Sequence, residues 1–177
     1  MADVSVRVAW ADDAPAIAAV QVAAWREGYA DVLPPDVLEA LRVDELAADW
    51  RDALVVSGDA RNRVLVALER NRVVGYAVTG PSPDPDADPV ADAEVAEVVV
   101  HPEERGVGHG SRLLQAVADT AVADRFTRAT TWVRASDDAM RGFLTSAGWA
   151  PDSAHRELDL RGDGAVTVKQ VRLHTSL

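Results

Sequence analysis

The sequence contains no cysteine, and this absence excludes several kinds of site at once. A chain without thiols cannot form disulfides, thiolate metal sites or a cysteine nucleophile. No uncharged apolar run approaches the length that a membrane-spanning helix needs. The N-terminus also lacks a basic start followed by an apolar run. We therefore expect no signal peptide and a cytoplasmic protein.

The chain has few positively charged residues: 18 Lys and Arg against 29 Asp and Glu, which gives a formal net charge of −11. This excess of negative charge argues against nucleic acid or an anionic membrane as a partner. An acidic surface attracts cationic amines, but it also keeps a protein soluble, and we favour solubility as its main role.

The length and composition suit one folded domain. The chain has 177 residues, of which 48% are hydrophobic and 27% charged. A chain of this size can bury a sizeable core and is short for two domains. We expect a single domain over residues 1–177.

Hydrophobic periodicity predicts an alternation of strands and helices. The order is strand, helices, three strands, helix, strand, helix and two strands, which predicts an α/β protein with helices on the faces of a mixed sheet. The expected strands are 4–9, 64–69, 73–79, 93–100, 130–134, 154–160 and 165–173. The expected helices lie around 13–28, 36–41, 44–54, 108–124 and 137–148.

Three local features give sharper expectations. Asn71 suits the turn between the second and third strands, which requires a positive φ. Residues 81–89 form an acidic, proline-rich loop that we expect to be extended and mobile. The helix over 108–124 should turn four apolar side chains inward: Leu113, Leu114, Val117 and Val122.

A glycine-rich loop joins the strand that ends at Val100 to the helix that follows. It reads Arg105-Gly106-Val107-Gly108-His109-Gly110 and comes shortly after His101-Pro102. Such loops expose backbone N–H groups at a helix N-terminus, where anions and above all phosphates bind. The residues after Gly110 are Ser-Arg rather than Lys-Ser/Thr, which excludes a Walker A loop, and the glycine spacing does not fit a dinucleotide fingerprint.

The strand, the His-Pro pair, the arginine and the glycines together resemble the pyrophosphate loop of the GCN5-related N-acetyltransferases, Arg/Gln-x-x-Gly-x-Gly/Ala. The resemblance covers nearly the whole chain, most specifically residues 94–149. The segment Trp25 to Tyr29, with Leu33-Pro34 and Trp50, is similar to a bacterial subgroup. The family implies the acyl-CoA N-acyltransferase fold, a twisted, mostly antiparallel sheet of about seven strands, and acetyl-CoA as acyl donor.

The resemblance implies a set of cofactor contacts. Pantetheine would lie along the fourth strand, on main-chain groups of Val98 and Val100 with Val99 between them, beside a β-bulge that separates this strand from the fifth. Arg105 either binds phosphate or is a solvated arginine, and His109 is expected to touch the phosphates. The remaining pyrophosphate contacts would come from Gly106, Val107, Gly108, Gly110 and Ser111.

Acetylation of an amine requires a base, because a lysine-like amine is mostly protonated at neutral pH. Glu97 lies five residues before Pro102, where the family frequently has a glutamate facing the cleft. It would take the proton directly or through water, and the alternative is a surface carboxylate. Glu94 is the second candidate, but a regular strand would point it to the other face unless a bulge intervenes.

The sequence departs from the family at the general acid. Aligned on Gly148-Trp149, the tyrosine position of the last helix holds Leu144 and the asparagine position holds Asp137. Leucine cannot donate a proton, although a thiol is already a tolerable leaving group. Ser136, Tyr29 or water are the alternatives, and the sequence does not choose among them.

Trp25 and Tyr29 are the candidate acceptor contacts, because the early helices line the acceptor side of the cleft in such enzymes. Aromatic walls hold amines by cation–π contact, although aromatics at helical spacing are more often core. The four histidines show no metal-binding spacing, so we expect no metal.

The sequence thus predicts an acetyl-CoA-dependent N-acetyltransferase that acts on a primary amine of a small molecule or peptide. A non-catalytic acyl-CoA-binding module is the main alternative, because Leu144 replaces the tyrosine. A nucleotide-binding protein of another class rests on the glycine loop alone. The resemblance also suggests a homodimer through the C-terminal hairpin.

Overall fold

The computed structural model describes residues 3–56 and 58–177, and its helices lie where the sequence predicts them. Two short 3-10 segments, η1 (Ala11–Asp13) and η2 (Pro102–Glu104), precede helices. The α-helices of this described part are α1 Ala14–Gly28, α2 Pro35–Glu39, α3 Val43–Val55, α4 His109–Ala123 and α5 Asp138–Ser146.

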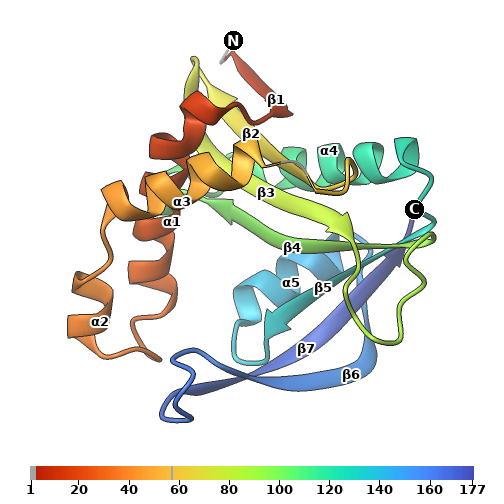
Figure 1. Ribbon diagram of the computed structural model, residues 1–177. Helices are drawn as coiled ribbons and strands as arrows, with labels where there is room; N and C mark the ends of the chain where they lie inside the picture. Colours follow the sequence, from red (N-terminus) through yellow and green to blue (C-terminus); the bar gives the residue numbers. More distant parts are fainter. Residues whose placement is uncertain (1–2, 57) are drawn as a thin grey trace.

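The strands form one seven-stranded sheet in the order β1-β2-β3-β4-β5-β7-β6. β4 and β5 run parallel and the other neighbouring pairs run antiparallel. The sheet twists so that the β5-β7-β6 part turns away from the β1-to-β4 part (Figure 1). The strands are β1 Val4–Val8, β2 Arg63–Glu69, β3 Arg72–Pro81, β4 Asp92–Val100, β5 Arg128–Arg134, β6 Ala150–Asp159 and β7 Thr167–Ser176.

Helices cover both faces of this sheet. On one face, Ile17 of α1 and Trp50 of α3 pack around Tyr76 of β3. On the other face, Leu113 of α4 and Leu144 of α5 belong to a larger core over the middle strands. The predicted fold class, a mostly antiparallel sheet with helices on both faces, is confirmed.

The β2-β3 hairpin follows from its turn residues. Arg70 and Asn71 have φ of 50° and 64°, the left-handed conformation that a two-residue hairpin turn requires. Asparagine tolerates this conformation better than most residues. The sequence prediction at Asn71 is therefore confirmed.

The prediction that Val122 faces inward is wrong. Val122 is 54% exposed, whereas its neighbour Ala121 is 3% exposed and packs with Phe126 and Ala93. The apolar stripe of α4 runs through Leu114 and Ala121, seven positions apart, which places Val122 beside the stripe.

The acidic loop after β3 is tied to the sheet, contrary to the expectation of an extended and mobile segment. Arg172 of β7, 6% exposed, donates to Asp84 at 3.0 Å and to Asp86 at 2.7 Å. The Trp132 indole N–H donates to Asp84 at 3.0 Å. The partners lie on distant strands, so no local pattern in the sequence indicates these anchors.

Candidate active site

β4 carries a β-bulge that turns two glutamates to the same face of the sheet. Glu97 lies opposite Val78 of β3. Glu94 lies opposite Gly80. The two glutamates are three positions apart on β4, but their partners are only two positions apart on β3, so β4 has one extra residue, Ala96. Alternate positions on a strand share a face, so the glutamates share the face of Val78 and Gly80. The expected bulge is present, and it removes the objection to Glu94.

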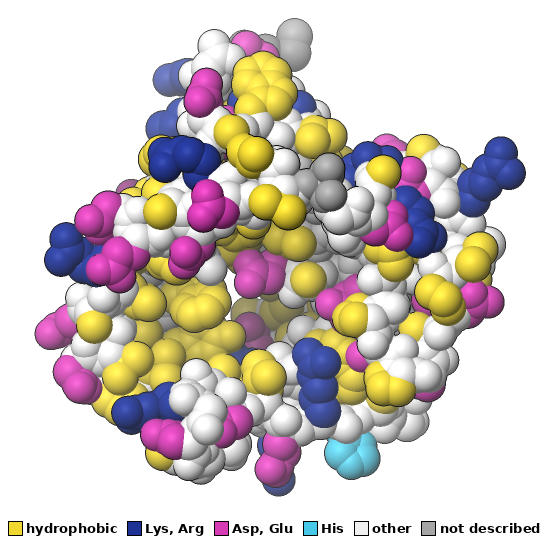
Figure 2. Space-filling view, in the orientation of Figure 1, with side chains coloured by type: hydrophobic (Ala, Val, Ile, Leu, Met, Phe, Trp, Pro, Cys, Tyr) yellow, Lys and Arg dark blue, Asp and Glu magenta, His cyan; other side chains and the backbone are white. Residues whose placement is uncertain are grey.

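β4 separates from β5 soon after the two strands begin to pair. The parallel pairing covers Asp92 to Glu94, and the hydroxyl of Thr131 on β5 donates to the Val95 carbonyl at 2.7 Å. No strand of the described chain pairs with this edge of β4 farther on. The space-filling view shows a hollow in the middle of the molecule, with acidic side chains inside and hydrophobic side chains around it (Figure 2).

The main chain of Val98 and Val100 faces this open edge. The N–H of His101 donates to the Val74 carbonyl of β3 at 2.9 Å. Backbone groups of successive strand residues point to opposite edges, so those of Val98 and Val100 point away from β3. The Val100 carbonyl accepts a bond from Arg105 Nε at 3.3 Å, as this orientation requires.

The glycine-rich loop presents a run of free backbone donors. Gly106 and Gly108 have φ of 80° and 94°, which residues with a side chain rarely adopt. The N–H groups from Gly106 to Ser111 donate no hydrogen bond within the described residues. Arg112 lies over the loop, and its guanidinium donates to the Val107 carbonyl at 3.2 Å. The sequence analysis did not predict a role for Arg112, because this residue comes after the glycine motif.

Arg105 connects the loop region to α1. Its guanidinium lies 3.2 Å from the Glu27 carboxylate, and the side chain is 47% exposed. The arginine therefore already has an anionic partner in this conformation. A phosphate contact from Arg105 stays a prediction, and it would require exchange of that partner.

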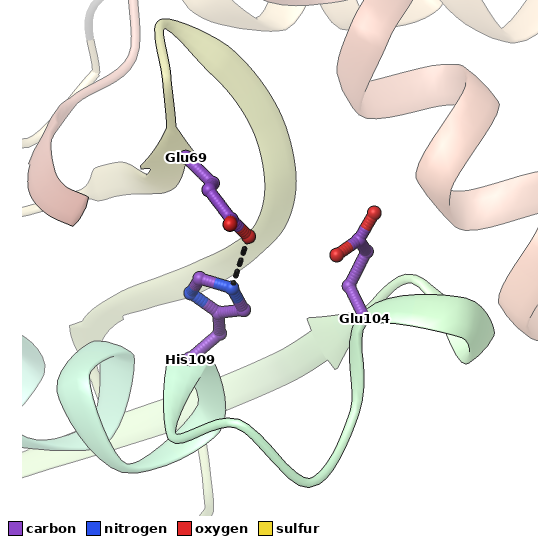
Figure 3. Close-up of side chains that lie close together, drawn as sticks. All are labelled: Glu69, Glu104 and His109. Atoms are coloured by element: carbon purple, nitrogen blue, oxygen red, sulfur yellow. Dashed lines mark hydrogen bonds and ion pairs between the residues drawn. The ribbon is translucent and has the colours of Figure 1, made fainter. Parts of the chain in front are cut away.

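The His109 side chain points into the protein and lies against Glu69 (Figure 3). Its Nε2 lies 3.1 Å from a Glu69 oxygen, and the residue is 2% exposed. A phosphate contact by His109 would therefore come from its backbone N–H. Glu104 lies close enough for the three donor atoms to fall within 4.8 Å of one another, but Arg72 already pairs with Glu104 at 2.5 Å. The contacts among His109, Glu69, Glu104 and Arg72 tie the loop and the start of α4 to the β2-β3 hairpin.

Glu97 is held by a buried tyrosine that the sequence reasoning missed. The Tyr76 hydroxyl donates to Glu97 Oε2 at 2.6 Å. Burial raises the pKa of Glu97, and the bond from Tyr76 opposes that shift. Burial also raises the pKa of Tyr76, which keeps the phenol protonated as a donor. A carboxylate with a raised pKa in a cleft suits a general base.

Replacement of Tyr76 by Phe should move the pKa of Glu97 further upward, because the bond that lowers it is lost. If Glu97 is the base, the acid limb of the pH dependence of kcat/KM then moves to higher pH, since deprotonation requires a higher pH. Steady-state rates across pH measure this. If the acid limb stayed at the same pH, the group whose titration controls the rate would not be Glu97.

Comparison with known proteins places this architecture. Residues 20–149 match the acetyltransferase (GNAT) family. The chain belongs to that family. A mycothiol acetyltransferase of Thermomonospora curvata is 38% identical over 82 residues, 46% of this chain and 26% of that protein. An uncharacterised N-acetyltransferase of Bacillus subtilis, YuaI, is 28% identical over 73% of this chain and 71% of its own length.

Solved structures agree with the family at the level of the fold. YncA of Salmonella typhimurium, whose structure holds acetyl-CoA, superposes with a TM-score of 0.72 at 22% identity, over 99% of this chain and 94% of that one. The predicted membership of the GCN5-related N-acetyltransferase family is confirmed by the match over residues 20–149. The chain spans about a quarter of the length of the mycothiol acetyltransferase.

A buried leucine occupies the position where the family has its general-acid tyrosine. Leu144 is 2% exposed and packs with α4 residues, so the last helix offers no proton donor there. Asp137, at the family's asparagine position, caps α5 by accepting from the Met140 N–H at 3.0 Å. The sequence identified both departures, and the structure gives each a structural role.

Trp25 of α1 and Tyr29, the residue just after this helix, form an aromatic pair. Trp25 and Tyr29 pack with ring centroids 5.3 Å apart, and Arg134 of β5 stacks on Tyr29 at 4.5 Å. Burial raises the pKa of Tyr29, Arg134 lowers it, and Glu97 raises it again. The Tyr29 ring is therefore covered by a cation, and its phenol also feels the charge of the candidate base. Arg134 is a further residue that sequence reasoning missed.

None of the helices in the described part of the chain is long and apolar enough to cross a bilayer.

Proposed function

We propose that this protein transfers the acetyl group of acetyl-CoA to a primary amine of a small molecule or peptide, by direct attack in a ternary complex. One observation carries the proposal. The half-buried Glu97 carboxylate lies on β4, and the same strand has an open edge at Val98 and Val100 because it separates from β5.

The residues present fit acetyl-CoA. The N–H groups of Gly106 to Ser111 and the guanidinium of Arg112 would hold the pyrophosphate. The open edge at Val98 to Val100 would bind pantetheine as though it were another strand. Bound there, acetyl-CoA supplies a thioester next to the acidic hollow.

Glu97 would accept the proton of the attacking amine, directly or through water, and so free the nitrogen lone pair to attack the thioester carbonyl carbon. The Val100 N–H points to the open edge and is the candidate donor for the developing oxyanion. The carbon–sulfur bond then breaks, and the thiolate takes a proton. Tyr29, Ser136 and water remain the candidates for that last donation.

A non-catalytic acyl-CoA-binding module is the second candidate, because the buried Leu144 replaces the usual acid. Both candidates require cofactor binding, and only the first requires turnover. Release of CoA thiol in the presence of an amine and peptide panel separates them. Binding of acetyl-CoA with no acetylated product in that panel would favour the module.

Gly108→Glu should weaken acetyl-CoA binding about a hundredfold or more, because it places a negative charge among the phosphate donors. A Cβ at Gly108 would also lie 3.2 Å from the Arg112 guanidinium. Calorimetric titration with acetyl-CoA measures the affinity. Gly162→Glu is the matched control, because Gly162 has φ of 76° in the β6-β7 turn, with no atom near its Cβ position. Equal acetyl-CoA affinity in both variants would mean that the glycine-rich loop is not part of the cofactor site.

A further inference from the structure

Glu94 has no role in the mechanism above, and it is a half-buried carboxylate without a partner. Its carboxylate accepts no hydrogen bond from the described residues, and it forms no ion pair with them. Burial raises its pKa, as does Asp84, while Arg156 lowers it. Placing a carboxylate where it is half desolvated and unpaired costs free energy that a bound cation would offset.

Arg156, whose charge acts on Glu94, and Arg172 of β7 are both committed to other groups. Arg172 binds Asp84 and Asp86, and Arg156 stacks on Trp132 and bonds to Gln170 at 2.7 Å. The chain thus neutralises the Asp84 carboxylate of the loop and leaves Glu94 open. An acidic group that the fold does not neutralise suits a cationic ligand.

The register fixes the distance between the two glutamates. Glu94 and Glu97 lie opposite Gly80 and Val78, two positions apart on β3. The Cα atoms of such positions on one face of a strand are about 7 Å apart. Side chains that leave the same face at this Cα spacing can contact the two ends of an aliphatic chain of a few carbons that carries an amino group at each end.

We infer that the acceptor is an α,ω-diamine or an amine with a comparable second cation, and that Glu94 binds the distal ammonium while Glu97 serves the amine under attack. This inference rests on the proposed acetyl transfer and names its substrate class. The distal ammonium stays charged at neutral pH and would give Glu94 a charge-assisted bond. The hydrophobic side chains around the hollow suit the carbon chain (Figure 2).

The test compares 1,4-diaminobutane with n-butylamine, which has the same chain and one cation. The unmodified protein should acetylate the diamine with a kcat/KM about tenfold or more higher, with 1,3-diaminopropane and 1,5-diaminopentane defining the optimum length. Glu94→Gln should remove this preference by raising KM for the diamine, so that the kcat/KM values for the diamine and n-butylamine converge. Glu157→Gln on the exposed β6 is the matched control and should retain the preference.

Binding is measured separately, by calorimetric titration of 1,4-diaminobutane into the CoA-loaded protein. Weaker binding in Glu94→Gln than in Glu157→Gln supports the assignment even without turnover. Equal kcat/KM for diamine and monoamine overturns it and leaves the acetyltransferase proposal standing. Absence of diamine binding to the CoA-loaded protein overturns it as well. Absence of acetylation of any amine contradicts the proposed function instead.

Discussion

Glu97→Gln should lower amine acetylation by about 10²–10⁴-fold, the usual contribution of a general base, while acetyl-CoA affinity is retained. Gln keeps the shape of the side chain and still accepts the bond from Tyr76, but it cannot take a proton. CoA thiol release measures turnover and calorimetry measures affinity. Glu157→Gln, an exposed glutamate on β6, should leave both unchanged. Full activity of the Glu97→Gln variant would mean that Glu97 is not the general base.

The same variant should be more stable than the unmodified protein at neutral pH. Burial raises the pKa of Glu97 in the folded state, so the folded protein binds this proton more tightly than the unfolded chain does. The unmodified protein therefore loses stability as pH rises from the ordinary glutamate pKa through the raised one. Gln removes that loss, and thermal unfolding of both proteins across this range should show the difference at high pH and its disappearance at low pH.

Local signals in the sequence predicted most of the fold. Asn71 marks a turn that needs positive φ, and the glycines at 106 and 108 adopt the conformations that their loop requires. Apolar periodicity located the strands and helices, because side chains on one face share one environment. The error at Val122 arose in the last turn of α4, where one residue of offset changes the face.

The site was less predictable because its pairings depend on strand register. The Tyr76–Glu97 bond spans 21 positions and depends on the register between β3 and β4. Residue types do not reveal a bulge, so the orientation of Glu94 stayed open. The His109–Glu69 contact spans 40 positions and likewise has no fixed spacing in the sequence.

The anchor of the acidic loop spans still more of the chain, and its loss should have the largest effect on stability. Arg172→Ala leaves Asp84 and Asp152, 8% and 12% exposed as side chains, without their shared guanidinium. Removal of one partner from a buried pair costs about 3–5 kcal/mol, and we expect the lower end because Arg128 still pairs with Asp152 at 3.0 Å and Asp86 is 64% exposed. Urea unfolding measures the free energy. Arg161→Ala, whose pair with Asp163 is exposed, is the control and should cost little.

The pH dependence of this loss distinguishes an ionic anchor from simple packing. The bond from Arg172 lowers the pKa of Asp86 to about 2. For Asp152, burial acts upward, but the Ala154 N–H and Arg172 outweigh it and its pKa is also lowered. Depressed carboxyl pKa values stabilise the folded state above the ordinary aspartate pKa, and this contribution disappears as pH falls through the folded values. The stability gap between the unmodified protein and Arg172→Ala should therefore narrow as pH falls from about 4 towards 2. A gap that stays constant over this range would mean that packing of the Arg172 side chain, whose guanidinium carbon lies 5.5 Å from the Trp132 ring centroid, holds the loop rather than its ion pairs.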